Sequence, residues 1–209
     1  MMNTIFYENP FREFNSLTSI VLPKNFREEW KIMMKDLNYV SLREVEIPGS
    51  ILDIPYGLFS NCSSLKKITM HNGLKAIRSE AFAECISLEK ISIPKSVCVI
   101  DKDVFRNCIS LKKLEVDPNN RKYCDMDGAL FDKSKTTLIR FPSNKQVDYY
   151  QIPNSVKIID DLAFQNCSFI TLPTNLIRIS SYCFVDWASL KKVKLNHCTD
   201  LTTLEEKCF

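Results

Sequence analysis

A period of 23 residues constrains this chain more than any other feature of its sequence. Phenylalanines recur at that spacing, a cysteine follows each of them by three residues, and a leucine follows by six. The three columns are Phe59, Phe82 and Phe105; Cys62, Cys85 and Cys108; and Leu65, Leu88 and Leu111. Columns that keep a common phase at a fixed period in this range are typical of a solenoid, in which each repeat packs on its neighbours. We therefore expect a single solenoid over residues 1–209.

Each coil is expected to hold a strand written L-x-x-I-x-I, usually closed by a proline, and then a second aliphatic pair three residues apart. A parallel sheet on the concave face, with short turns or helical segments on the convex face, would bury every apolar column. The period divides the chain into about eight such coils. The sequence thus predicts a strand-rich repeat solenoid with few helices.

Two segments depart from the regular coil. Residues 24–38 place apolar side chains at helical spacing, which predicts an amphipathic helix that covers the core, with a membrane-surface helix as the alternative. The register breaks at Asp117, and the coil over 117–153 is enlarged before the pattern resumes at Tyr150. Two apolar runs in it, 129–131 and 138–141, flank a polar turn, which predicts a β-hairpin.

The nine cysteines first suggest redox or metal chemistry. Four of them, Cys167 included, occupy one repeat column, so we expect a reduced and buried ladder, with disulfides between successive coils as the alternative. No CxxC pair indicates zinc. The sequons at Asn61 and Asn166 follow from the same F-x-N-C turn, and we interpret these asparagines as turn residues rather than glycan acceptors.

Composition excludes several classes of function. Hydrophobic residues make up 45% and charged residues 25% of the chain, and the net charge is +3. Such a mild charge does not indicate nucleic acid as a partner, and no apolar run reaches the ~20 residues that span a bilayer. The first residues do not form a secretory signal, so the sequence favours a cytoplasmic location slightly over the cell surface.

Catalytic and cofactor-binding residues are not expected in this chain. Its two histidines, His71 and His197, lie in turns far apart in the repeat order, and the column cysteines should face inward, so no Cys–His pair is predicted. The sequence contains neither a phosphate-binding glycine loop nor a cluster of metal ligands at workable spacing. We predict that the protein is not an enzyme and binds no cofactor.

The repeat resembles that of the BspA-like, or type 5, leucine-rich repeat family, L-x-x-I-x-I-P-x-x-V-x-x-I-x-x-x-A-F-x-x-C-x-x-L. Residues 86–111 and 154–167 match it nearly throughout, and the resemblance covers residues 11–209. Proline follows the strands where ordinary leucine-rich repeats carry an asparagine ladder. The resemblance implies a binding or adhesion module of bacterial surfaces or of protists, without catalysis.

The outward positions of the strands are the candidate partner-binding residues. They are Lys67, Thr69, Lys90, Ser92, Lys113, Glu115, Lys192 and Lys194. Their lysines form a mixed basic stripe that would suit an acidic protein surface, although the same stripe would also serve solubility. We expect an interaction scaffold that uses this face and the irregular coils. The alternatives are a cell-surface adhesin module and an architectural segment of a larger protein, in which the coil that ends at Phe209 associates end to end.

Overall fold

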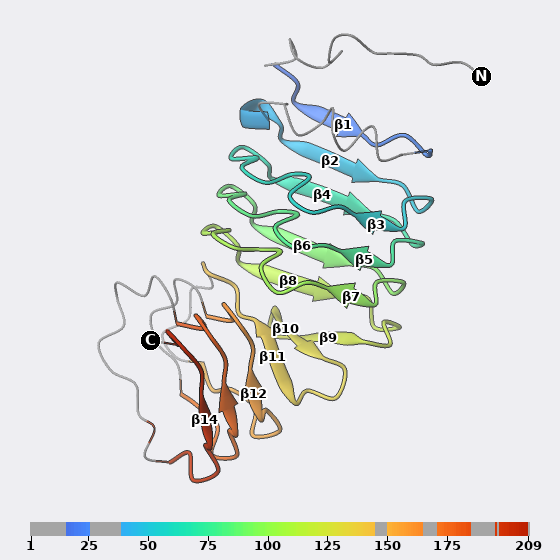
Figure 1. The fold of residues 1–209 in the computed structure, drawn as a ribbon. Helices are drawn as coiled ribbons and strands as arrows, with labels where there is room; N and C mark the ends of the chain where they lie inside the picture. The colour runs from blue at the N-terminus through green and yellow to red at the C-terminus, as the bar shows by residue number, and fades with distance from the viewer. Residues whose placement is uncertain are drawn as a thin grey trace, which may run out of the picture.

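The computed structural model describes residues 16–25, 39–144, 150–164, 171–184, 195 and 197–208. Over these residues the chain winds as a strand-rich solenoid of about seven turns (Figure 1), which confirms the predicted fold class and roughly matches the predicted number of coils. The helical structure within them is one 3-10 turn, η1 (Tyr39–Ser41). The helix expected over 24–38 lies outside the described residues except for Lys24 and Asn25, which form a turn.

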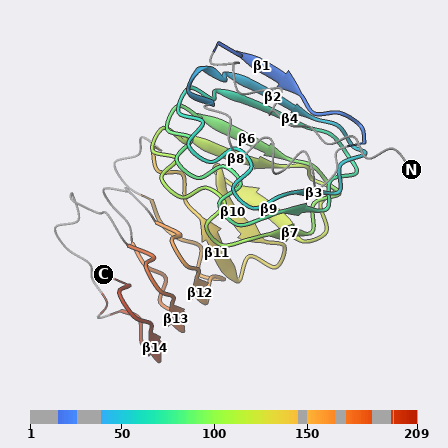
Figure 2. The ribbon, with the colours of Figure 1, turned by 45° about the horizontal axis from the view of Figure 1, so that its top comes forward.

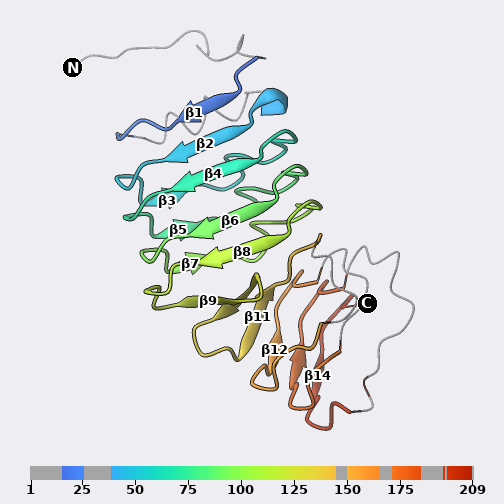
Figure 3. The same ribbon diagram turned by 180° about the vertical axis from the view of Figure 1, so that it is seen from behind.

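The L-x-x-I-x-I segments form the long strands of the solenoid. These are β1 (Ser19–Val21), β2 (Glu44–Ile47), β4 (Lys67–Met70), β6 (Lys90–Ile93) and β8 (Lys113–Val116). Parallel pairing joins β1 to β2, β2 to β4 and β6 to β8, and Figure 3 shows the five strands side by side. In β6 the side chains of Ile91 and Ile93 are buried while Lys90 and Ser92 are exposed, so the alternation of the sequence sets which face is core.

The second aliphatic pair of each coil also forms a strand, on the other side of the coil. The short strands β3 (Asp53–Ile54), β5 (Ala76–Ile77) and β7 (Val99–Ile100) pair in parallel. Their register places Ile54, Ile77 and Ile100 beside one another. A second narrow sheet therefore accompanies the turns expected on this side, and the core lies between the two sheets.

Between the two sheets the repeat columns stack as ladders. The rings of Phe59 and Phe82 lie 5.7 Å apart at 4°, and those of Phe82 and Phe105 lie 6.3 Å apart at 5°. The column cysteines are fully buried, and the Cys85 thiol donates to the Phe59 carbonyl at 3.2 Å. Cys108 makes the equivalent bond to Phe82 at 3.1 Å. Cys85 and Cys108 thus each satisfy a backbone carbonyl of the preceding coil, while Cys167 lies outside the described residues.

The turn before each column cysteine requires a left-handed backbone. Asn61, Glu84 and Asn107, each two residues after a column phenylalanine, have φ of 63°, 61° and 56°. Asparagine tolerates this region better than most residues because its side chain bonds local backbone. The position recurs with glutamate, so the geometry accounts for Asn61 without a glycan. Asn166, in the second sequon, lies outside the described residues.

The enlarged coil contains three antiparallel strands. They are β9 (Tyr123–Met126), β10 (Ala129–Asp132) and β11 (Thr137–Arg140), and they contain the two apolar runs on which the hairpin prediction rests, except for Phe141, which follows β11. Strand β9 was not expected from the sequence. It turns into β10 through Asp127 and Gly128, at φ 51° and 81°, and the Asp132 carboxylate closes the next turn by accepting from the amides of Thr136 and Thr137. We refer to residues 123–140 as the meander.

After the meander the solenoid continues in a turned orientation (Figures 1 and 2). The short strands β12 (Ile158–Ile159), β13 (Arg178–Ile179) and β14 (Thr203–Leu204) pair in parallel with β11 and with one another, which completes a six-stranded sheet with the meander. The Phe141 amide donates to the Ala163 carbonyl, as the Phe59 amide does to Ala81. Regular packing therefore resumes at Phe141, ahead of the position that the sequence pattern indicates.

Two hydrophobic cores result, and β10 separates them. Leu130 packs in the core of β1–β8, whereas Ala129 and Phe131 pack in the core of β11–β14. Because neighbouring residues of a strand point to opposite faces, a single strand forms a wall of both cores. Among the described residues, no helix is long and apolar enough to cross a membrane.

Candidate functional site

The exposed face of β1, β2, β4, β6 and β8, called here the long-strand face, carries the six described candidate residues. Lys67, Lys90 and Lys113 begin their strands, and each side chain is more than half exposed. Thr69, Ser92 and Glu115 follow two residues later, on the same face. The strand register aligns Lys90 with Lys113 and Ser92 with Glu115. Lys192 and Lys194 lie outside the described residues.

The strand-start lysines are paired with carboxylates, which the column pattern alone did not reveal. The Lys67 ammonium lies 3.6 Å from Glu44. Glu115 binds two lysines at once, since its oxygens lie 2.6 Å from Lys90 and 2.8 Å from Lys113. Hydrogen bonds from Lys113 and then Lys90 lower the pKa of Glu115 to about 2. The stripe is therefore a mixed ionic row rather than a line of free cations.

A further row of basic side chains precedes these lysines and was missed in the candidate set. Arg43, Lys66 and Lys112 are exposed and stand one residue before the strands, at the second position of L-x-x-I-x-I. Lys112 pairs with Glu89 at 2.8 Å and lowers the pKa of that carboxyl, chiefly by its hydrogen bond. The repeat phase would have located this row, because it occupies a single column of the same motif.

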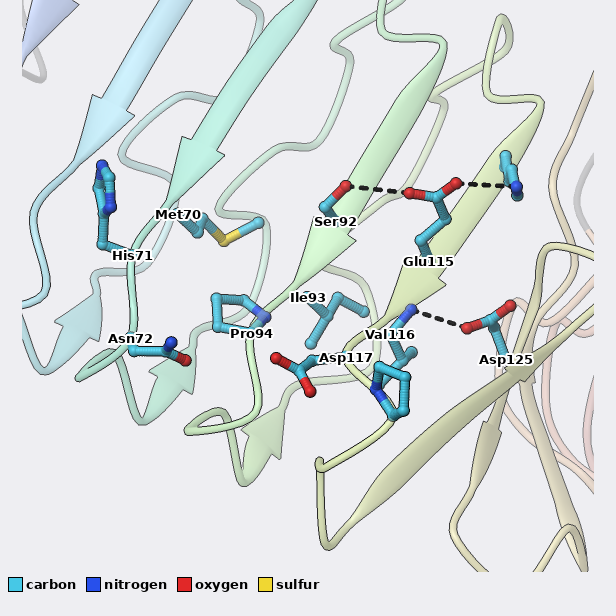
Figure 4. Close-up of a pocket in the computed structure, with 12 residues that line it drawn as sticks. Met70, His71, Asn72, Ser92, Ile93, Pro94, Glu115, Val116, Asp117 and Asp125 are labelled. Atoms are coloured by element: carbon cyan, nitrogen blue, oxygen red, sulfur yellow. Dashed lines mark hydrogen bonds and ion pairs between the residues drawn. The ribbon is translucent and has the colours of Figure 1, made fainter.

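Two hollows indent the long-strand face and meet in its middle. The first lies over β4 and β6 and is lined by residues that include Lys66, Lys67 and Lys90. The second lies toward the strand ends, beside β9, and is lined by residues that include His71, Glu115 and Asp125 (Figure 4). Both hollows are lined by Met70 and Ser92, so together they form one groove, called here the strand-face groove.

The meander contributes directly to the second hollow. The Asp125 carboxylate, on β9, accepts a hydrogen bond from the Val116 amide at 2.8 Å and so covers part of the open edge of β8 (Figure 4). Asp117 and Glu115 lie on the same side of the hollow. His71 is placed 3.0 Å from Glu46 on the neighbouring strand. The groove thus ends in carboxylates where β8 meets the irregular coil.

The side chains described above equip the groove for binding contacts. The described residues contain no group of three or more His, Cys, Asp or Glu side chains that would hold a metal ion. The column thiols are buried away from the groove, and burial raises the pKa of Cys108 while a hydrogen bond with Cys62 and burial raise that of Cys85. A thiol held protonated is a poor nucleophile. The surface can form ion pairs, hydrogen bonds and apolar contacts.

Comparison with known proteins agrees with this architecture. The family model for the BspA type leucine-rich repeat region matches six copies over residues 30–150 and 140–209. The chain is similar to the crystal structure of the pneumococcal vaccine antigen PcpA, with a TM-score of 0.71 and 27% identity over 92% of this chain and 51% of that one. It therefore spans about half the length of the PcpA chain.

A leucine-rich repeat protein from Eubacterium ventriosum shares the fold, with a TM-score of 0.50 and 20% identity over 90% of this chain and 65% of that one. No curated protein sequence matches the chain. The six family copies, taken with the two sheets and the stacked columns, show that the chain belongs to the BspA-type leucine-rich repeat family.

Proposed function

We propose that this protein is a non-enzymatic interaction module that binds another protein through the strand-face groove. The observation that carries the proposal is the continuity of the groove, whose two hollows are both lined by Met70 and Ser92. Ligand sites are concave and combine apolar contact with a few polar groups. The side chains that line this groove have that mixture.

The scaffold beneath the groove supports binding because its inward side chains are buried and its strands are paired. Ile68, Ile91 and Leu114 are buried under the face, and each long strand has a parallel neighbour. The outward side chains between them, such as Thr69 and Ser92, make no contribution to that core. The residues at outward positions can therefore vary to suit a partner while the residues at inward positions maintain the fold. This division of roles suits a recognition surface.

An adhesin-like module is the second candidate, and the likeness to PcpA favours it. That protein is described as a vaccine antigen, and 92% of this chain superposes on it. The same groove would then bind a host or matrix protein. Treatment of intact cells with external protease separates the two candidates, because cleavage of the full-length protein on intact cells would place it at the surface and support the adhesin.

The binding face is tested by filling the groove. The double variant Thr69→Trp with Ser92→Trp places two indoles over the centre of the face, and Lys75→Trp with Lys95→Trp is the control at exposed positions outside the long strands. Each protein is used as bait in the source organism's extract, with quantitative mass spectrometry. We expect partners that bind the wild type and the control but not the groove variant. Equal recovery by both variants would exclude the groove.

A further inference from the structure

The strand-face groove is charged oppositely at its two ends. Around the strand starts stand six basic side chains and two acidic ones: Arg43, Lys66, Lys67, Lys90, Lys112 and Lys113, with Glu44 and Glu89. Beyond the strand ends stand Asp117 and Asp125, together with His71, whereas Glu46 and Glu115 lie level with Thr69 and Ser92 in the strand register. Lys113 at a strand start and Asp117 beyond the strand end are four residues apart, or roughly 13 Å at the rise of an extended strand, and Glu115 between them binds Lys90 and Lys113.

Over β4 and β6 the middle of the groove is uncharged, and Glu46 on β2 and Glu115 on β8 flank it. Thr69, Met70 and Ser92 lie between the two groups, and the Met70 side chain is partly exposed. A thioether on a flexible side chain adapts to apolar groups of different shape. The groove is therefore basic at the strand starts, neutral with an apolar contact over β4 and β6, and acidic where β8 ends beside β9.

The lysines at the basic end remain accessible to a partner. The Lys67, Lys90 and Lys113 side chains are 64%, 54% and 52% exposed although each has a carboxylate partner. Exposed ion pairs of this kind contribute little to stability, so they exchange readily with charges of a bound molecule. A uniformly anionic surface would meet the carboxylates around Asp117 and Asp125, and a uniformly cationic one would meet the lysines. Both are disfavoured by like-charge contact.

We propose that the groove recognises an extended peptide segment whose two ends carry opposite charge. Acidic residues of the segment lie over the strand starts, basic residues lie over the strand ends, and a small or apolar residue lies on Met70 between them. This inference rests on the proposed function, since it specifies the partner of the same groove. Complementary charge fixes the orientation of such a segment and speeds its association.

The direct probe is a pair of fluorescein-labelled hexapeptides of identical composition. One has blocked charge, Glu-Glu-Leu-Ser-Lys-Lys, which separates the charge centres by about four residues as in the groove. The other alternates glutamate and lysine around the same two neutral residues. Fluorescence anisotropy with the full chain at low salt should show the blocked peptide binding about fivefold more tightly, the size expected of one or two exposed charge contacts. The difference should shrink at high salt because exposed charges are screened.

Charge-reversal variants test which end of the groove acts on which end of the peptide. Lys66→Glu with Lys67→Glu should abolish the preference for the blocked peptide, and Lys75→Glu with Lys95→Glu, which changes the net charge equally at exposed sites outside the long strands, should keep it. A photo-crosslinker at the acidic end of the peptide should label the strand starts, and one at the basic end should label the segment near Asp117.

Equal affinity for the two peptides, or crosslinks in the reverse orientation, would overturn the inference. Tighter binding of an all-acidic hexapeptide would do so as well, and would instead indicate a partner recognised by the lysine row alone. These results are distinct from failure of the proposed function. If the tryptophan variant loses its partners while the charge-reversal variant retains them, the groove is the binding site, but it does not recognise its partner by the order of charges.

Discussion

A column of stacked phenylalanines runs through the coils before the meander and through those after it. The number of residues between successive phenylalanines differs between the two regions. Phe59, Phe82 and Phe105 are 23 residues apart and their rings stack at 5.7 and 6.3 Å. Phe164 and Phe184 are only 20 residues apart, yet their rings lie 5.6 Å apart at 3°. The pitch of the solenoid is therefore set by contacts within the column, and the coil can shorten elsewhere without altering it.

The two regions differ most at the place where they join. In the regular coils the carbonyl of the column phenylalanine accepts a cysteine thiol from the next coil. At the junction the Phe105 carbonyl accepts instead from the guanidinium of Arg140, at 2.9 Å. The same buried guanidinium donates to the Leu162 carbonyl beyond the meander. One cation thus replaces the repeated thiol and binds a carbonyl on each side of the junction.

The largest expected effect comes from emptying the shared column in each region. Phe82→Ala and Phe164→Ala should each lower the free energy of unfolding by about 3–5 kcal/mol, because both remove a fully buried ring. Since β10 belongs to both cores, we expect one urea transition, followed by circular dichroism, to shift in both variants. Lys90→Ala is the exposed control and should stay within about 0.5 kcal/mol. Two separate transitions would show that the regions unfold independently.

The junction itself is tested by Arg140→Met, which keeps much of the side-chain volume and removes the donors. It should cost about 3 kcal/mol, because the carbonyls of Phe105 and Leu162 lose hydrogen bonds from a charged group inside the protein. Arg106→Met is the matched control within the regular coils, where the guanidinium forms ion pairs with Glu80 and Glu84 at a partly exposed site. Equal losses in the two variants would remove the distinction drawn here for the junction.

A smaller loss of stability is expected at Asn120, where the regular repeat pattern ends. Asn120 stands 23 residues after Val97, but its buried amide group donates to the Pro94 and Val97 carbonyls and accepts from the amides of Lys122 and Tyr123. Asn120→Val restores the aliphatic residue of the repeat and should nevertheless cost about 2 kcal/mol, since buried backbone groups lose their partners. A gain in the urea midpoint would show that the aliphatic column outweighs these bonds.

The smallest effect concerns the ionic row of the regular coils. The pKa of Glu115 lies at about 2 in the folded protein, below its ordinary value of 4.5. Its contribution to stability is therefore present above pH 4.5 and is lost as the pH falls from there toward 2. The difference in urea midpoint between wild type and Glu115→Gln should shrink over that range, and a difference that stays constant with pH would contradict this expectation.

The regular coils were predictable because each inward residue belongs to a column. The phase of Phe59, Phe82 and Phe105 was enough to locate the long strands and the buried faces. The meander was harder to predict from the sequence, since the residues of β9 are half-buried and form a strand by pairing with β10. Periodicity predicts which residues point inward. It does not predict which side chains of neighbouring coils form contacts, such as Lys90 with Glu115, nor the role of a residue outside the repeat columns, such as Arg140.

The double role of β10 also limits how the protein can be rearranged by recombination. A whole coil between β2 and β8 can be duplicated or removed with equivalent surfaces meeting at the new boundary, because successive coils present the same columns. A crossover within the meander would leave either Leu130 or Phe131 facing water in one of the products. Variation in repeat number should therefore accumulate on either side of residues 123–140, with the meander inherited as one block.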